Sequence, residues 1–262
     1  MRLKENKQLE TFYQGVYKKG EKKHFTPFVT KGTTSTEVKE ILKQINWKSK
    51  RVLDVGCGTG NFVNEVSRRG VKYVLGIDYA EEAIKIAKTK YSKKNLEFKT
   101  QDVKEIDDKF DVIVSIGTIE HMDKPIDILK KLKKCLKPNG KIILTTPNWT
   151  NPRGYVLMTL HFLFNAPITL ADLHYLTPNE HLKMAKKLNM KMKWRTIEQS
   201  WGNGDIMIKD FQRRIPNIMK DMKMKLDDKK MKLFMEWLKT NVVSMNNSLP
   251  QNGAIGLYIY SK

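Results

Sequence analysis

The sequence predicts an α/β fold built on a doubly wound, mostly parallel β-sheet, and three observations lead to this class. A short apolar run at residues 52–55 meets a glycine-rich turn and then an amphipathic run, which is the order strand, turn, helix. The apolar runs at 112–116 and 142–145 show no polar alternation, as expected of inner strands buried on both faces. The runs at 96–99 and 190–195 alternate apolar and charged residues, which is typical of outer strands with one wet face.

Length and cysteine content limit the class of protein. A chain of 262 residues can bury one sizeable core with added segments. Its two cysteines, Cys57 and Cys135, are too few for a disulfide framework, and neither belongs to a metal-type pair. The first ten residues are charged and lack the apolar core of a signal peptide, and no stretch is long enough to span a bilayer. We therefore expect a cytoplasmic protein.

The chain is strongly basic, with a formal net charge of +21 from 49 basic and 28 acidic residues. Such a charge permits a nucleic acid, an anionic membrane or an acidic substrate as partner. Much of it is lysine scattered over the expected helix faces, where solvation of the surface explains it equally well. Charge alone therefore does not choose a partner.

The glycine-rich turn is the stretch that points to a ligand. Gly56, Gly58 and Gly60 stand at alternate positions, and Asn61 occupies the place of the third glycine of the dinucleotide pattern. Asp54 precedes the first glycine by two residues. Taken alone, such a turn is also found in ordinary loops. The pattern D-x-G-x-G-x-G resembles the first motif of class I S-adenosylmethionine (SAM) dependent methyltransferases.

A second strand at 71–77 ends in Asp78 and Tyr79. A carboxylate at this strand tip is placed to accept hydrogen bonds from both ribose hydroxyls of a nucleoside-type cofactor. Tyr79 could then lie against the adenine ring. The alternative is that Asp78 caps a helix over 81–88.

Two further strand ends continue the same edge of the sheet. Asp102 and Val103 follow the third strand, where a short polar residue resembles the family position that binds the adenine amino group; a turn role for Asp102 is the alternative. Ser115 and Ile116 end the fourth strand. The sequence L-K-P-N-G at 136–140, before the next strand, also resembles a family motif.

Four such matches in the right order make the chain similar to class I SAM-dependent methyltransferases over roughly residues 40–200. The resemblance implies a Rossmann-like sheet of seven strands, with the last one, at 253–260, antiparallel. It also implies a core at 35–200 and 251–262 and an N-terminal helix and flap at 1–34, whose helix at 5–18 either folds over the cofactor or packs on the sheet. The implied SAM-binding residues are Asp54, Gly56, Cys57, Gly58, Gly60, Asp78, Tyr79, Asp102, Val103, Ser115 and Ile116.

Two helical lid segments depart from the bare fold. Residues 151–176 form an apolar lid segment whose run at 155–164 is apolar nearly all round, so it is either buried or set against an apolar surface. Together with the following H-x-x-T-P-x-E, it resembles the quinone-biosynthesis O-methyltransferase branch, and similar layouts occur in methyltransferases of sugars and other small molecules. Residues 201–250 form a helical insertion over the substrate side, with a break expected at Pro216 and a helix N-cap at Asp227 or Asp228.

The candidate catalytic residues follow the fourth strand. His121 is the best candidate for a general base, because methyl transfer to a hydroxyl requires loss of a proton; a purely structural histidine at a helix start is the alternative. Glu120 would orient His121 or contact the cofactor, and His174 is a second candidate. An E-x-x-E-H cluster is associated with a divalent metal in the quinone branch, but Gly117 stands in place of its first carboxylate. We therefore expect no metal.

The function that these observations favour is methyl transfer from SAM to the oxygen of a small-molecule or lipid-like acceptor, of quinone or sugar type. An RNA methyltransferase is an alternative because of the basic surface, although the chain has no N-P-P-Y-type motif. A SAM-binding protein without turnover, held at an anionic membrane by lysines and the 155–164 helix, is another. The acceptor's identity and the oligomeric state are left open.

Overall fold

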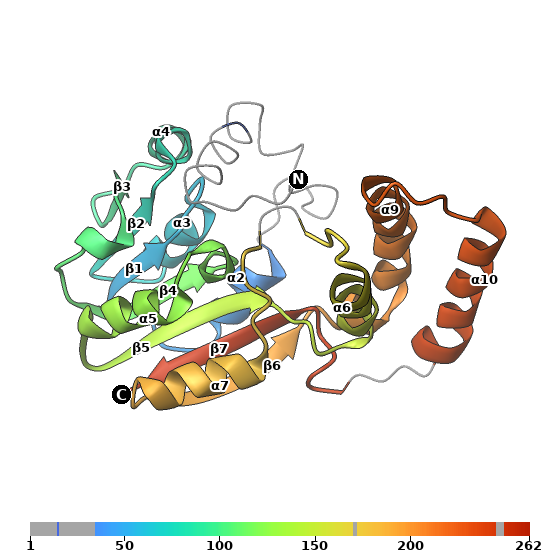
Figure 1. Ribbon diagram of the computed structural model, residues 1–262. Coiled ribbons are helices and arrows are strands. Elements are labelled where there is room, and N and C mark those ends of the chain that lie inside the picture. Colours follow the sequence, from blue (N-terminus) through green and yellow to red (C-terminus); the bar gives the residue numbers. More distant parts are fainter. Residues whose placement is uncertain (1–14, 16–34, 170–171, 245–248) are drawn as a thin grey trace.

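The computed structural model describes residue 15 and residues 35–169, 172–244 and 249–262. The flap and helix expected at 1–34 therefore lie outside the described residues, except for residue 15. Helices and strands alternate along the core, and four helices form a separate group on one side (Figure 1). The elements are α2 (Thr36–Leu42), β1 (Arg51–Val55), α3 (Asn61–Ser67), β2 (Tyr73–Asp78), α4 (Glu81–Lys90), β3 (Leu96–Thr100), η2 (Val103–Glu105), β4 (Phe110–Ile116), η3 (Ile119–His121), α5 (Pro125–Lys134), β5 (Leu136–Pro147), α6 (Pro152–Phe164), α7 (Pro178–Lys187), β6 (Lys191–Ile197), α8 (Gln199–Asn203), α9 (Asp205–Asp221), α10 (Asp228–Leu238), η4 (Lys239–Val243) and β7 (Ile255–Ser261).

The sheet has seven strands in the order β3-β2-β1-β4-β5-β7-β6. The first five are mutually parallel, and β7 runs antiparallel between β5 and β6. The order reverses at β1, from which the chain builds the sheet outward on both sides. The predicted doubly wound sheet with an antiparallel last strand is therefore confirmed, including β3 and β6 as its two edges.

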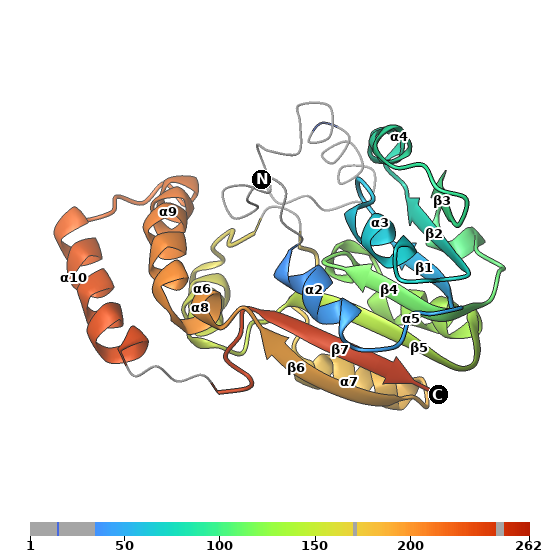
Figure 2. The same cartoon turned by 180° about the vertical axis from the view of Figure 1, so that it is seen from behind.

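Helices cover both faces of this sheet (Figures 1 and 2). The apolar sides of α2, α3 and α4 pack on one face, where Ile41, Val63 and Ala87 are completely buried. The helices α5 and α7 pack on the other face, where Leu129 and Leu132 are completely buried. Because the strands β1, β4 and β5 are covered on both sides, their apolar runs are continuous.

A third core joins α6, α9 and α10 beyond the end of the sheet (Figure 2). Its buried residues include Leu157 of α6 and Phe211 of α9. The expected break at Pro216 is wrong, because α9 continues through this residue to Asp221. A proline removes one backbone donor, but Ile215 and Ile218 on either side of it are buried, and this packing offsets the lost hydrogen bond.

A buried ion pair fastens α6 to α9. Arg153 Nε donates to Asp210 Oδ2 at 2.9 Å, and Arg214 Nε donates to the same oxygen at 3.1 Å. Asp210 is completely buried. Burial by itself raises the pKa of Asp210, but the charges of Arg153 and Arg214 prevail and lower it to about 2.

Local signals in the sequence set several element boundaries. The side chain of Ser35 accepts a hydrogen bond from Val38 N at the start of α2, and Asp227 caps α10 by accepting from Lys229 N and Lys230 N. Strand β5 begins earlier than expected, at Leu136, so the L-K-P-N-G stretch lies within the strand beside a register shift. Among the described residues, no helix combines the length and the apolar character needed to cross a membrane.

Candidate active site

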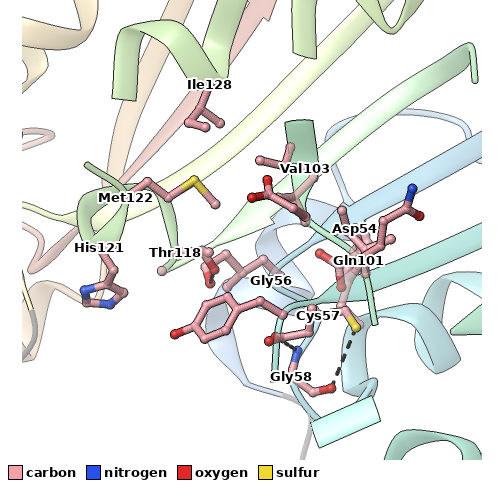
Figure 3. Close-up of a pocket in the computed structure, with 18 of the residues that line it drawn as sticks. Asp54, Gly56, Cys57, Gly58, Gln101, Val103, Thr118, His121, Met122 and Ile128 are labelled. Carbon is pink, nitrogen blue, oxygen red and sulfur yellow. Dashed lines mark hydrogen bonds between the residues drawn. The ribbon is translucent and has the colours of Figure 1, made fainter. Parts of the chain in front are cut away.

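A cavity of about 780 Å³ opens at the carboxyl ends of β1, β2, β3 and β4. This is the edge of a doubly wound sheet at which ligands bind. Thr118, His121 and Met122 lie at one end of the cavity, and Asp54, Cys57 and Gln101 lie toward the other (Figure 3). One ligand in this cavity could therefore contact residues at the end of β3 and residues at the end of β4.

The turn after β1 gives the cavity its backbone wall. Gly56, Gly58 and Gly60 have φ angles of 73°, 50° and 84°, a region that favours glycine. A Cβ on Gly56 would come within 2.4 Å of Thr118 Cγ2. The glycines at 56 and 58 therefore bring the backbone close to a ligand where a side chain would not fit.

Asp78 ties this turn to the tip of β2. Its Oδ2 accepts a hydrogen bond from Gly58 N at 2.9 Å, and its Oδ1 accepts from Ala80 N at 2.9 Å. Burial raises the pKa of Asp78. The N-cap of α4 is Ala80, so Asp78 does not cap this helix. Asp78 lines the cavity wall, where a carboxylate can accept a hydrogen bond from a ribose hydroxyl.

Asp54 lies beneath the glycine turn and is only 1% exposed. Its Oδ1 has no hydrogen-bond partner among the described residues, although it belongs to the cavity wall. Burial, and then the charge of Asp78, raise the pKa of Asp54 to about 8. A buried carboxyl oxygen without a hydrogen-bond partner lowers the stability of the fold. Its place at the cavity therefore points to a ligand with a positive charge or a donor group.

The end of β3 supplies the other wall. Asp102 and Val103 line the cavity, and Asp102 Oδ1 also accepts from Lys104 N at 2.8 Å, so the turn role and the lining role coexist. Gln101 lines the cavity as well, and our sequence analysis missed it. Its signal was available, because a polar residue directly after a strand reaches the same edge as its neighbours. Tyr79 lines the cavity and is 41% exposed.

The remaining predicted cofactor residues divide into two groups. Cys57 and Ile116 line the cavity. Gly60 and Ser115 are not among its lining residues; the Ser115 hydroxyl donates to Val55 O at 3.1 Å and joins β4 to β1. A Cβ on Gly60 would lie 2.6 Å from Phe98 Cζ, so this glycine serves the packing of the turn on the sheet.

Two of the predicted catalytic residues, Glu120 and His121, occupy the short η3 helix after β4. His121 lines the cavity, and its Nδ1 lies 3.4 Å from Asp172 Oδ1. Both side chains are largely buried, with exposed fractions of 17% and 12%. Our sequence analysis did not identify Asp172, because it lies in the lid segment and nothing in the sequence links it to η3. The pair makes Nδ1 the protonated ring nitrogen and leaves Nε2 as the nitrogen that can act as a base.

Glu120 lies behind His121 and does not line the cavity. Its carboxyl is buried and its Oε2 has no hydrogen-bond partner among the described residues. Burial, and then the charge of Asp172, raise the pKa of Glu120 well above its ordinary value. Its backbone carbonyl accepts from Leu173 N and His174 N, which fixes the lid segment beside Asp172.

His174 is also separate from the cavity lining. Its Nε2 donates to Asp123 O at 3.0 Å and so joins the lid segment to the loop after η3. Within the described part of the chain, Glu120, His121 and Asp172 form one group whose ligand atoms all lie within 4.8 Å of one another, close enough to share a metal ion. The second carboxylate of this group comes from Asp172, since Gly117 has no side chain to supply it.

Comparison with known proteins places the chain in a protein family. A family model described as a methyltransferase domain matches residues 31–194. A ubiquinone biosynthesis O-methyltransferase from Neisseria meningitidis is 34% identical over 114 residues, covering 41% of this chain and 48% of that protein. The chain thus spans about half the length of the curated relatives it matches.

Solved structures show the same fold at low identity. A putative methyltransferase of Haloferax volcanii, in complex with the Trm112 methyltransferase activator, superposes with a TM-score of 0.61 at 15% identity, over 99% of this chain and 98% of that one. Phosphoethanolamine N-methyltransferase 2 of Haemonchus contortus, in complex with SAM, gives a TM-score of 0.54 at 17% identity, over 86% of this chain and 52% of that one.

The family model covers more than half of the chain, and the cavity has the features that SAM requires. The Asp54 oxygen that has no hydrogen-bond partner among the described residues suits a cationic cofactor, and the glycine turn and Asp78 line the wall beside it. The chain belongs to the methyltransferase domain family, and its sheet has the fold of the solved methyltransferases named above.

Proposed function

We propose that this protein transfers the methyl group of SAM to a hydroxyl oxygen of a small-molecule or lipid-like acceptor, of quinone or sugar type. The quinone class is supported by the curated relatives, which are named ubiquinone biosynthesis O-methyltransferases. The observation that supports oxygen as the acceptor atom is the pairing of His121 with Asp172 beside the cavity. A hydroxyl must lose its proton to become an effective nucleophile, and a histidine held by a carboxylate is suited to accept it.

SAM supplies an electrophilic methyl group when it is bound. The residues that would hold it are Asp54, Asp78 and the backbone of Gly56 and Gly58. The chain's own contribution to the reaction is alignment of the acceptor and removal of water from the cavity. His121 accepts the acceptor's proton at Nε2, and Asp172 holds the ring through Nδ1 and stabilises the imidazolium that forms.

Glu120 and His174 have positioning roles in this proposal. The backbone carbonyl of Glu120 receives the amides of Leu173 and His174, which keeps the neighbouring Asp172 close to His121. The bond from His174 to Asp123 O holds the same segment from its other side. Neither side chain lines the cavity, so neither is proposed to touch the acceptor.

The test is methyl transfer from radiolabelled SAM to a panel of hydroquinones, catechols, sugars, primary amines and bulk tRNA. We expect the label in a hydroxyl-bearing small molecule, and we expect His121→Ala to abolish most of that transfer. Label in tRNA, with strong dependence on salt, would contradict the proposal and support the RNA alternative. Cofactor binding without transfer to any acceptor would support a SAM-binding protein without turnover.

A further inference from the structure

Large apolar side chains are exposed on the helices at the end of the molecule away from α4. On α6 these are Tyr155, Phe162, Leu163 and Phe164, with exposed fractions of 61%, 76%, 71% and 55%. Isolated exposed apolar residues are ordinary, but four within one helix of thirteen residues are not. The sequence of α6 contains no acidic residue.

The exposed apolar residues of α6 lie on its solvent side. Tyr155, Thr159 and Phe162 are separated by four and three residues, so they share one side of the helix, and Leu163 follows Thr159 by one turn. The opposite side of α6 is its packing side, where Leu157 is completely buried. The run at 155–164 is therefore apolar on two sides, of which one packs on the protein and one meets solvent.

The helix α10 presents a matching apolar side. Leu233 and Trp237 are 64% and 57% exposed and lie one turn apart. Its buried side is formed by Met235 and Leu238. Phe234, between the two sides, reaches toward α6.

An apolar groove of about 470 Å³ connects these two surfaces. It is lined by residues of α6 and α10 and by Ile215 of α9. Its lining residues are Tyr155, Val156, Thr159, Leu160, Ile215, Leu226, Lys230, Met231 and Phe234. Of the exposed apolar residues on α6, Tyr155 lines this groove. We call the groove, together with the exposed apolar side chains of α6 and α10, the lobe face.

Lysines lie along the α10 side of the lobe face. Residues 220–232, which lead into and begin α10, contain six lysines and three aspartates. One of these aspartates, Asp227, caps α10. Lys230 is exposed and lines the groove itself, while Lys229 and Lys232 are exposed beside it. Long lysine side chains can lay their apolar stems along such a surface and keep their charges at its edge.

We propose that the lobe face docks on the surface of an anionic phospholipid membrane. Exposed Phe, Leu and Trp side chains with lysines on one side are a composition that inserts into the headgroup region of such a membrane. No helix of the described residues can span it, so the contact is peripheral. The excess of lysine around the face favours a lipid surface of negative charge over a neutral one. This docking goes beyond the proposed methyl transfer and does not depend on it.

The test is sedimentation of the full-length protein with vesicles of phosphatidylcholine alone and of phosphatidylcholine mixed with phosphatidylglycerol. We expect binding to the mixed vesicles only, weakened by salt. Leu163→Ser should weaken it roughly ten-fold, since one inserted leucine contributes about that factor. The matched control is Leu182→Ser on α7, an exposed leucine outside the lobe face, which should bind as the wild type does.

A second pair of variants tests the charges. Lys229→Glu with Lys230→Glu should reduce binding at least roughly ten-fold. Lys85→Glu with Lys88→Glu makes the same change in net charge on α4, which lies at the other end of the molecule in both views, and should reduce it much less (Figures 1 and 2). Circular dichroism checks that all four variants fold.

Several results would overturn the proposal. These are no binding of the wild-type protein to mixed vesicles, equal binding to neutral ones, or equal losses in the test and control variants. Binding of bulk tRNA lost on the Lys229 and Lys230 reversal, without vesicle binding, would assign the face to nucleic acid. A concentration-dependent dimer abolished by Leu163→Ser, without vesicle binding, would assign it to a second copy of the chain.

Discussion

His121 Nδ1 lies 3.4 Å from Asp172 Oδ1, which joins the end of β4 to the lid segment beside the cofactor cavity. The two residues come from separate parts of the chain and meet because the backbone carbonyl of Glu120 accepts the amides of Leu173 and His174. The expected lid segment therefore reaches the site from a distant part of the sequence. It supplies the carboxylate that orients the proposed base.

The His121–Asp172 pair predicts a loss of turnover without a loss of cofactor affinity. His121→Ala should lower kcat by roughly 10²- to 10⁴-fold, the usual contribution of a general base. Asp172→Asn should lower kcat by a smaller factor, because the base is retained and only its orientation is lost. His161→Gln, which changes a histidine outside the cavity lining, is the control. Steady-state kinetics and calorimetry with S-adenosylhomocysteine measure both quantities; unchanged kcat in His121→Ala would place the base elsewhere.

Chelation separates a proton-transfer role from a metal role for Glu120, His121 and Asp172. Gly117 stands where the first carboxylate of the metal-associated cluster would be, and Glu120 does not line the cavity. We therefore expect turnover to be unchanged after treatment with EDTA and dialysis. Activity that disappears with EDTA and returns with Mg²⁺ would show that the three side chains hold a metal.

Asp54 predicts a pH dependence of stability. Its pKa is about 8 in the folded protein and ordinarily 3.8, so the folded state holds a proton that the unfolded state has lost between these values. The resulting stabilisation is complete below pH 3.8 and is lost as the pH rises through about 8. The free energy of unfolding of the wild type, relative to Asp54→Asn, should therefore fall over this range by about 1.4 kcal/mol per pH unit.

Urea denaturation of both proteins at several pH values measures this difference. The control is Asp107→Asn, which changes a carboxylate that is 97% exposed and should give no slope. A difference between wild type and Asp54→Asn that is constant with pH would mean that the Asp54 carboxyl is charged in the folded protein at neutral pH.

Asp210 predicts a pH dependence of stability opposite to that of Asp54, because its carboxyl stabilises the fold when it is charged. Its pKa is lowered from 3.8 to about 2, so its contribution is present above pH 3.8 and is lost as the pH falls through about 2. At neutral pH, Asp210→Asn leaves the buried Arg153 without a charged partner and should cost about 3–5 kcal/mol of unfolding free energy. Asp221→Asn, at an exposed position of the same helix, is the control. A loss below 1 kcal/mol in urea denaturation would show that Arg153 has other means of compensation.

The sheet and most of the cofactor cavity could be predicted because their signals are local in the sequence. Continuous apolar runs mark β1, β4 and β5, and the residues that follow each strand must meet at one edge. By that rule the ends of β2 and β3 bring Asp78 and Asp102 to one edge, and both line the cavity, as does Asp54 within β1. The rule also extends to Gln101, which we overlooked because its neighbour Asp102 better matched the family pattern.

The remainder could not be predicted because it depends on packing between distant segments. Asp172 reaches His121 only through the fold of the lid, and no spacing in the sequence records that contact. Pro216 signals a helix break locally, but buried neighbours on α9 and their contacts with α6 prevail. The exposed side of α6 is equally hidden in the sequence, since a helix that is apolar all round does not reveal which side is covered.

Titration calorimetry with S-adenosylhomocysteine tests the central claim most directly, because the account depends on a cofactor held by Asp78 and the glycine turn. We predict that the wild-type protein binds it and that Asp107→Ala, at an exposed carboxylate, binds it equally well. Asp78→Ala should bind it too weakly to measure, since the variant loses the proposed ribose acceptor and the bond to Gly58 N. Unchanged affinity in Asp78→Ala, or no binding by the wild type, would contradict the assignment of this cavity to SAM.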